Sequence, residues 1–438
     1  MAFEINFLTI FVMAATGGIA ASLANRNIAV YNDGLRPMYD SYIAGEIDRK
    51  TLFAASFSMS FVLIAGFGLP VSIAGKIIII HAILPACDIT GTFFRDDKKG
   101  LVLSAVTGAV LGVLLMFALE GIYGFFSILP VPFMDKLSSI GSLVVVLFCV
   151  FPSLAIAYQT NTLTGLIVLI LTMLIKHLAS IFEGFKINNI NAAYDADGLA
   201  LLFAIIAMVF IAARVSKKTT GSAMEAFAVF EKNIDRIKKN IVLIAISGGI
   251  VAAATTLLLV AEGPASMAFT AEGRYKEAAL AALVRCIGFI PLVMTTAVIS
   301  GVYSPAGTKA IHVPAILFIN FGIMGLAGSF LAGVLIMIIE ILLLGFIAKG
   351  LDRFPGMKEL GDNTRTAMSK VLDIAFLAGG MMAANAIAPT IGFIWVIGLF
   401  YLNQNSKKPV SGMAIGPIGA ISMGILVNLL HLAGLFPK

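Results

Sequence analysis

The stretch RVSKKTTGSAMEAFAVFEKNIDRIKKN, residues 214–240, is the most polar part of the chain and separates two long hydrophobic blocks. It carries an excess of lysine and arginine, which marks a loop beside membrane spans as cytoplasmic. Its apolar residues recur at alternating steps of four and three, which predicts a helix with one apolar and one basic face. We expect this helix to lie in the inner membrane interface, with a solvated linker as the alternative. The apolar stripe is Ala223, Phe227, Phe230, Ile234, Ile237 and Ile241.

The rest of the chain is strongly apolar. Of its 438 residues, 59% are hydrophobic and 12% are charged, against about 25% charged in an ordinary soluble domain. Many segments exceed the roughly 18–20 apolar residues that span a bilayer, and none shows the alternation of a membrane β-barrel. The sequence therefore predicts an all-α polytopic integral membrane protein with about 11–13 transmembrane helices. We assign the net charge of +6 to cytoplasmic loops and expect no binding to nucleic acid.

Lysine and arginine gather in four loops, which set the predicted topology. The positive-inside rule places all four in the cytoplasm and the N-terminus in the periplasm. The chain then consists of an N-terminal transmembrane half (1–213), a cytoplasmic linker helix (214–240) and a C-terminal transmembrane half (241–438). The four loops are 25–50, 93–100, 214–240 and 349–370.

Two features predict broken helices and an internal repeat. The last long apolar block is interrupted by NAIAPTIG (385–392), which predicts a broken or re-entrant segment, with one tilted helix as the alternative. ILPACDIT (83–90) and FIPLVMTT (289–296) follow similar basic stretches in the two halves, and they align Pro85 with Pro291. We therefore predict two repeat-related halves with proline-broken helices, a plan common among transporters. Chance similarity between apolar segments is the alternative.

Ionisable side chains inside the predicted spans are the sharpest functional signal, because placing one at mid-helix costs about 2.5–3.5 kcal/mol. Asp88 follows Pro85, which should kink its helix, so we expect Asp88 and Thr90 to bind a coupling ion, H⁺ or Na⁺. The alternative is that Asp88 merely nears the cytoplasmic end of its span. Arg285 and Glu340 lie deep in their spans, where they could pair with each other. Arg285 is otherwise expected to contact an anionic substrate, and Glu340 to serve as a second ion-coupling residue.

Replacing Asp88 by asparagine removes charge without removing volume. On the sequence alone, we expect Asp88→Asn to abolish ion-coupled uptake while leaving folding largely intact.

Polar uncharged residues gather where helices are predicted to break, and we expect them to bind solute. Helix-packing hydrogen bonds are the alternative. Together with Arg285, the predicted substrate-binding residues are Thr295, Thr296, Asn385, Thr390, Gln159 and Asn161.

Motifs for enzymatic chemistry are missing from the sequence. Cys87, Cys149 and Cys286 sit in apolar segments without a CxxC pair, so they indicate neither disulfides nor zinc. There is no HExxH, Walker lysine loop or GxSxG elbow, and the four histidines stand singly. We therefore expect no enzyme, no metal and no cofactor beyond the coupling ion.

Several stretches spread over nearly the whole chain carry a family resemblance. They are DGLRP (33–37), FEKNIDRIKKN (230–240), IGFIPLVMTTAVISGVY (287–303), GDNTRTAM (361–368) and LVNLLHLAGLF (426–436). These stretches are similar to the YhfT family of uncharacterised polytopic proteins of the bacterial inner membrane. The resemblance implies a multi-pass protein of that membrane and a transporter, and it implies no particular substrate or site.

The sequence thus favours a secondary transporter that moves a small polar or anionic metabolite across the bacterial inner membrane, driven by H⁺ or Na⁺. Breaks near Pro85, Pro291 and Pro389 would frame its site. One alternative is the membrane component of a phosphotransferase-type sugar system, which needs a separate soluble partner. Another is an intramembrane enzyme acting on lipid-linked substrates. By analogy with other transporters, we expect a homodimer in the lipid bilayer.

The predicted topology can be tested with a cysteine placed at Lys218. We expect a membrane-impermeant thiol reagent to leave this cysteine unmodified in intact cells, because the basic linker lies in the cytoplasm. Labelling from outside would reverse the whole assignment.

Overall fold

The computed structural model describes most of the chain. It is 82% helical with almost no sheet, which confirms the predicted all-α fold. The described residues are 4–75, 77–137, 139–140, 143, 146–147, 149–181, 185–187, 190–192, 196–214, 223–271, 273–353, 356–406 and 412–436.

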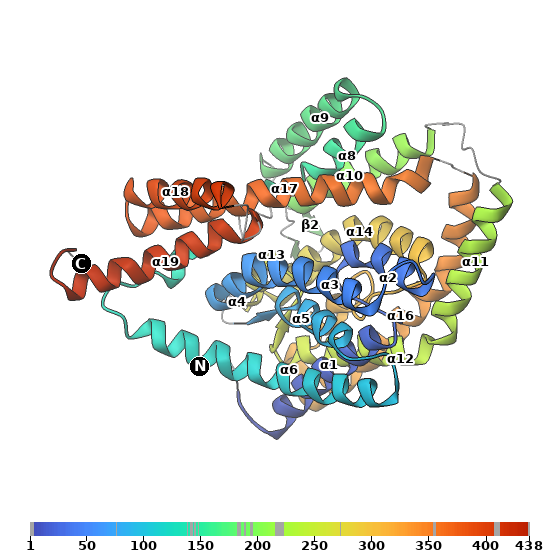
Figure 1. Cartoon of the computed structure of the whole chain (residues 1–438), viewed down its shortest axis with the longest axis horizontal. Coiled ribbons are helices and arrows are strands. Elements are labelled where there is room, and N and C mark those ends of the chain that lie inside the picture. The colour runs from blue at the N-terminus through green and yellow to red at the C-terminus, as the bar shows by residue number, and fades with distance from the viewer. Residues whose placement is uncertain are drawn as a thin grey trace.

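The first structural unit runs from α1 (Phe7–Asn25) to α6 (Lys98–Ser127). After α1 the chain turns at Asn27, which has a φ of 56°, into an extended segment. The unit ends with the long helix α6, which packs along α1 (Figure 1). Between them lie η1 (Asp33–Leu35), α2 (Arg36–Ile43), α3 (Arg49–Leu63), the π-helical η2 (Ile64–Gly68), α4 (Leu69–Gly75), β1 (Ile78–Ile79) and α5 (Ile80–Phe93).

A second unit repeats this order from α12 (Ile241–Thr256) to α16 (Gly322–Arg353). The chain leaves α12 through Leu258, whose φ of 58° matches that of Asn27, and α12 packs along α16. In each unit a short helix of eight residues follows the extended segment. The intervening elements are β4 (Val260–Ala261), α13 (Pro264–Ala271), α14 (Tyr275–Ser300), α15 (His312–Leu317) and η4 (Ile319–Phe321).

The register of this repeat differs from the predicted one. By element order, α14 corresponds to α3–α4 and α15 corresponds to α5, so Pro291 in α14 does not match Pro85 in α5. The predicted breaks at these two prolines are also wrong, because α5 and α14 each continue through their proline. The real interruptions are β1 and the segment 301–311. A proline removes one helical hydrogen bond, and here neighbouring turns keep the helix intact.

The extended segments of the two units pair with each other. Ile78 and Ile79 of β1 lie beside Val260 and Ala261 of β4 as parallel strands. After α1, Val30 donates its N–H to the carbonyl of Tyr303 at 2.8 Å, and Tyr303 donates to Ile28 at 3.0 Å. Each unit thereby satisfies backbone groups that the other exposes where its helices stop.

Side-chain caps begin several of the helices. Asn6 and Thr9 form a capping box at α1, each accepting the other's backbone N–H at 3.0 Å. Asp48 caps α3 by accepting the Thr51 N–H at 2.8 Å. Hydrogen bonds from the Thr51 hydroxyl and N–H lower the pKa of the Asp48 carboxyl. The cap therefore favours the ionised carboxylate.

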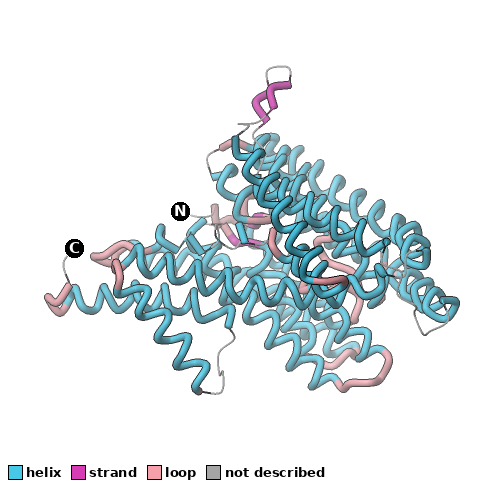
Figure 2. The backbone as a smooth tube through the Cα atoms, turned by 90° about the horizontal axis from the view of Figure 1, so that it is seen from above, coloured by secondary structure: helices cyan, strands magenta, loops and turns pink. Residues whose placement is uncertain are grey.

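The remaining helices follow the two units. The predicted interruption near Pro389 is confirmed, because one helix ends at Ile387 and the next begins at Ile391. The antiparallel pair β2–β3 projects from the helical body (Figure 2). These elements are η3 (Met134–Leu137), α8 (Phe151–Gln159), α9 (Thr162–Ile181), β2 (Phe185–Ile187), β3 (Ile190–Ala192), α10 (Ala196–Arg214), α17 (Gly356–Ile387), α18 (Ile391–Asn405) and α19 (Gly412–Leu432).

The predicted linker helix is present as α11 (Ala223–Lys239). Its apolar side chains Phe230, Ile234 and Ile237 are buried, and α11 packs against α14 and α16 (Figure 1). This part of the apolar face is therefore covered by protein, and the position of the helix in the membrane interface stays a prediction. Asn233 also donates to the carbonyls of Val298 and Ile299 at the end of α14.

Five helices among the described residues are long and apolar enough to cross a membrane, or six if the pair α11–α12, bent by 64°, is one span. The chain is therefore a membrane protein with multiple apolar helices. The number of 11–13 crossings, which counts shorter and broken helices as spans, stays a prediction, as does the orientation. The five are Phe7–Asn25, Lys98–Ser127, Thr162–Ile181, Ile319–Phe346 and Ile415–Leu432.

Glycine allows the close approach of α1 and α6. A Cβ on Gly108 would lie 2.4 Å from the carbonyl oxygen of Gly17, whereas a Cβ on Gly121, in the same helix, would meet nothing within 4 Å. We expect Gly108→Val to destabilise the protein by about 1–3 kcal/mol or more, because backbone must move apart. Gly121→Val is the matched control. Equal thermal unfolding of both variants in detergent micelles would contradict this packing.

Candidate functional site

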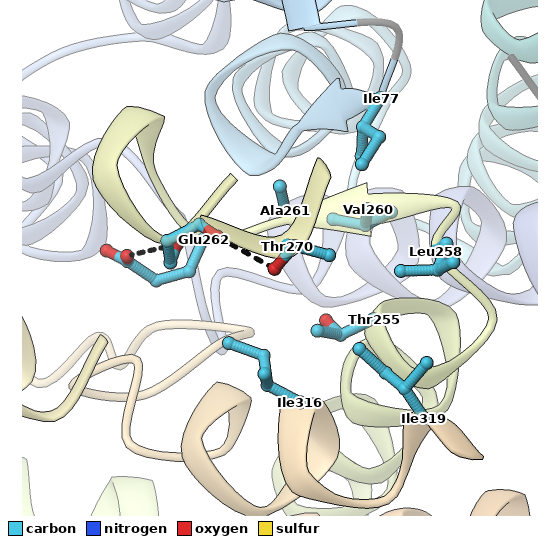
Figure 3. A pocket seen from close by; sticks show the side chains of 10 residues that line it. Ile77, Thr255, Leu258, Val260, Ala261, Glu262, Thr270, Ile316 and Ile319 are labelled. Carbon is cyan, nitrogen blue, oxygen red and sulfur yellow. Dashed lines mark hydrogen bonds between the residues drawn. The ribbon is translucent and has the colours of Figure 1, made fainter. Parts of the chain in front are cut away.

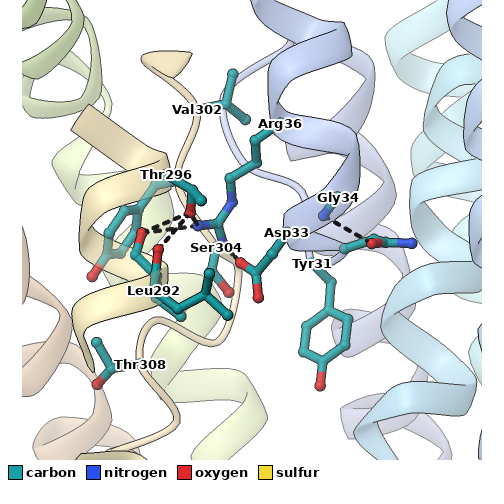
Figure 4. Close-up of polar contacts among 12 residues, drawn as sticks. Tyr31, Asp33, Gly34, Arg36, Leu292, Thr296, Val302, Ser304 and Thr308 are labelled. Carbon is teal, nitrogen blue, oxygen red and sulfur yellow. Dashed lines mark hydrogen bonds and ion pairs between the residues drawn. The ribbon is translucent and has the colours of Figure 1, made fainter. Parts of the chain in front are cut away.

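A cluster of buried ionisable side chains surrounds the place where the two units cross. The extended segment after α1, α5, the segment after β4, α14, the loop 301–311, α15 and α16 all contribute to it. Figure 4 shows the part of it around Arg36 and Asp33. Such groups are costly at membrane depth and are retained where they have partners or a ligand. The cluster comprises Tyr31, Asp33, Arg36, His81, Asp88, Glu262, Arg285, Lys309, His312 and Glu340.

Arg285 pairs with Glu262, not with Glu340. Its Nε lies 3.1 Å from Oε1 of Glu262, which is 1% exposed, and the Ser266 hydroxyl donates to the other oxygen at 3.3 Å. Gly263 makes room for this pair, since a Cβ there would lie 2.0 Å from Nη1 of Arg285. The predicted Arg285–Glu340 pair is therefore wrong. Glu262 was missed because it lies at the end of β4, in what looks like a loop between spans.

A second ion pair lies within the first unit, and its arginine ties that unit to α14 through hydrogen bonds. Arg36 is fully buried, and its Nη2 lies 2.8 Å from Asp33. Its Nη1 donates to the Val293 carbonyl at 2.9 Å and to the Thr296 hydroxyl at 2.7 Å (Figure 4). Thr296, a predicted substrate ligand, thus lies at the crossing and already accepts a protein hydrogen bond. The side chain of neighbouring Thr295, another predicted substrate ligand, is not among those that the structure describes.

Glu340 holds the loop 301–311 from α16. Its carboxylate accepts hydrogen bonds from the Tyr303 hydroxyl at 2.6 Å and the Thr308 N–H at 2.9 Å, and also from the Thr308 hydroxyl. A Cβ at Gly307, which has a φ of 55°, would lie 2.2 Å from this carboxylate. Glu340 therefore determines the backbone path of the loop.

Asp88 has a comparable role in the first unit. Its two carboxylate oxygens accept the N–H groups of Tyr31 at 3.0 Å and Asn32 at 2.9 Å. Asp88 is 1% exposed and so anchors the extended segment after α1. The Thr90 hydroxyl donates to the Ala86 carbonyl at 2.9 Å, within its own helix.

Lys309 is a buried cation of a different kind. It is 6% exposed, with a left-handed φ of 75°. Its Nζ lies 4.2 Å from the centre of the Phe289 ring and 5.9 Å from that of Tyr31. Among the residues that the structure describes, no carboxylate lies within 4 Å of it. Aromatic faces attract a cation, yet they do not replace an ion pair.

Three polar atoms near Lys309 also lack hydrogen-bond partners among the described residues. They are the Tyr31 hydroxyl, Nδ1 of His81 and Nε2 of His312. The rings of Tyr31 and His81 meet edge to face at 5.4 Å, while Nδ1 of His312 is bonded to the Thr255 hydroxyl at 2.8 Å. Buried polar groups are usually satisfied, so these three atoms call for a partner such as a water molecule or a ligand.

A small cavity adjoins this cluster at Glu262 (Figure 3). Its volume is about 10 Å³, which is at the lower limit for a single water molecule. Val260 and Ile316 give it a mainly apolar wall, and Thr255, Glu262 and Ser266 supply its polar groups. The described residues contain no group of three or more histidine, cysteine, aspartate or glutamate side chains that could hold a metal ion.

Four predicted substrate ligands lie away from the crossing, on helices outside the two units. Asn161 caps α9 by accepting the Thr164 N–H at 2.9 Å. Asn385 accepts the Thr390 N–H at 2.8 Å and stabilises the turn between α17 and α18. Gln159 ends α8 and is buried. The structure therefore brings Arg285, Thr296, Glu340 and Asp88 to the crossing and leaves these four elsewhere.

Comparison with known proteins identifies relatives over nearly the full length. The model of the YhfT family, described as a protein of unknown function, matches residues 9–436. The uncharacterized protein YhfT of Escherichia coli (strain K12) is 29% identical over 443 residues, covering 98% of this chain and 99% of the relative. No solved structure matches.

The contacts of Asp88 change what Asp88→Asn should do. An amide oxygen can accept one of the two N–H groups, and the amide nitrogen would face the other. We therefore expect a loss of about 1–3 kcal/mol in stability, instead of the intact folding expected from sequence. Asp235→Asn, on the exposed face of α11, is the control. Unchanged thermal unfolding of Asp88→Asn in micelles would show that these hydrogen bonds do not hold the segment.

Proposed function

Since the chain belongs to the YhfT family of proteins of unknown function, we propose its activity from the site: secondary transport of a small polar or anionic metabolite. The crossing of the two units carries this proposal. Backbone that is not helical is tolerated at membrane depth only where protein or a water-filled cavity satisfies it. In many transporters such breaks lie at the interface of two structural repeats and form the solute site.

Glu340 is our choice for the proton-coupling residue. It holds Tyr303 and Thr308, on either side of the turn that leads to Lys309. Protonation of Glu340 would weaken these hydrogen bonds, because a neutral carboxyl is a poorer acceptor. The position of the loop 301–311 then depends on whether Glu340 is protonated. Asp88 holds the extended segment after α1 in the first unit and is the second choice.

We place the protein in the bacterial inner membrane as a multi-pass protein with a periplasmic N-terminus, acting as a homodimer. The basic loops support this orientation, and the dimer rests on analogy with other transporters. Two other functions give different experimental outcomes. A phosphotransferase component would need a soluble phosphorylated partner, and an intramembrane enzyme would alter its substrate chemically.

Transport can be tested in proteoliposomes that contain the purified full-length protein and a pH-sensitive or Na⁺-sensitive dye. The probe is a low-molecular-weight metabolite extract from bacteria. We expect the extract to drive proton or sodium entry without any soluble protein, and liposomes without the protein to show none. Uptake only after addition of phosphoenolpyruvate and soluble extract would favour the phosphotransferase function. Chemical change of a metabolite without its uptake would favour the enzyme.

Glu340→Gln tests the coupling. We expect it to reduce gradient-driven uptake at least about tenfold while solute exchange across the membrane continues, because the carboxyl that carries the proton is gone. Glu231→Gln, on the exposed face of α11, is the control and should behave like wild type. Equal loss of exchange and gradient-driven uptake would show that Glu340 only maintains structure.

A further inference from the structure

We infer that Lys309 is the anion-binding residue of this protein, and that the site takes a small organic monoanion, such as a carboxylate, with hydrogen-bonding groups on its body. This inference rests on the proposed transport function and names the class of solute. Tyr31, His81, His312 and Phe289 form the rest of the site.

The ion pairs of the cluster leave one described cation, Lys309, without a partner. Arg36 is paired with Asp33 and Arg285 with Glu262, at 2.8 and 3.1 Å. Lys309 has no such partner among the described residues. A buried ammonium without a counter-ion is strongly unfavourable, so a ligand carboxylate would relieve that cost.

The remaining carboxylates of the cluster are already engaged by neutral donors. Asp88 accepts two backbone N–H groups, and Glu340 accepts from Tyr303 and Thr308. Neither is in ion-pair contact with Lys309. Lys309 is therefore the one described cation of the cluster without an ion-pair contact, and a single ligand carboxylate would supply that contact.

The neutral polar groups near Lys309 indicate which substituents the rest of the ligand carries. The Tyr31 hydroxyl, Nδ1 of His81 and Nε2 of His312 are buried by more than nine-tenths and lack partners among the described residues. They come from three different elements; the ring of His81 meets that of Tyr31, and the His312 backbone N–H donates to the Lys309 carbonyl at 3.2 Å. Hydroxyl and imidazole groups can donate or accept, so they suit a ligand with polar substituents. A purely aliphatic anion would leave them unsatisfied.

The protein also holds Lys309 in place before a ligand arrives. Its N–H donates to the Ala306 carbonyl at 3.0 Å, and its ammonium lies over the Phe289 ring at 4.2 Å. The preceding residue, Thr308, is fixed by Glu340. The left-handed φ of Lys309 is uncommon for a residue with a side chain, and such backbone geometry persists where the surroundings enforce it.

The test is thermal unfolding of the purified full-length protein in detergent micelles at pH 7 and constant ionic strength. The probes are glycolate, lactate and benzoate, each beside its uncharged amide, and inorganic phosphate. We expect at least one of the carboxylates to raise the melting temperature by about 2 °C or more, with its amide and phosphate giving smaller shifts.

Variants test whether this shift in melting temperature depends on Lys309. Lys309→Met should abolish the difference between carboxylate and amide, and Lys309→Arg should keep part of it. Lys238→Met, on the exposed face of α11, should respond like wild type. Equal shifts for each carboxylate and its amide in the wild-type protein would overturn the inference, even if Lys309→Met failed to fold. A carboxylate-specific shift that persists in Lys309→Met would overturn it as well.

Transport data separate this inference from the proposed function. Carboxylate binding that depends on Lys309, with no uptake of that carboxylate in proteoliposomes, would retain the anion site and reject transport. Ion-coupled uptake of a metabolite at the wild-type rate by Lys309→Met would retain transport and reject the anion site.

Discussion

The architecture depends on satisfying backbone groups where helices stop inside an apolar body. Each unpaired N–H or C=O in hydrocarbon costs several kcal/mol. Neither unit can meet this cost alone, because each presents its extended segment to the other: Val30 to Tyr303, and Ile78 to Val260. The pairing therefore holds the units together. It also brings polar backbone and side chains to one place in the interior.

The buried charges follow from that arrangement. A buried ion pair adds little net stability, while removing one partner strands a charge, so such pairs are better explained by positioning than by strength. Asp33–Arg36 links η1 to the start of α2, and Glu262–Arg285 links the segment after β4 to α14. Glu340 does the same for the loop 301–311 through neutral donors. Lys309 differs because, among the described residues, it has the rings of Phe289 and Tyr31 beside it and no carboxylate in ion-pair contact.

Part of the site could be predicted because a charged residue inside a membrane span is energetically costly and stands out in a hydrophobic segment of the sequence. Arg285 and Glu340 were identified in this way. Their partners could not be, because Glu262 lies between spans and its contact with Arg285 exists only after α13 and α14 fold together. Lys309 was overlooked for a similar reason. It lies in a stretch that the sequence places between two spans and the structure places in the interior.

The sequence by itself determined the membrane class, the helical content, the linker helix and the break near Pro389, because these depend on local hydropathy, periodicity and proline. Only the tertiary structure decided where the other breaks lie, which surface α11 covers and which charges meet. Those outcomes depend on contacts between residues well separated in the sequence, within one unit for Glu262 with Arg285 and between the units for Arg36 with Thr296. No local pattern encodes them, since each side chain acquires its partner only when the helices pack.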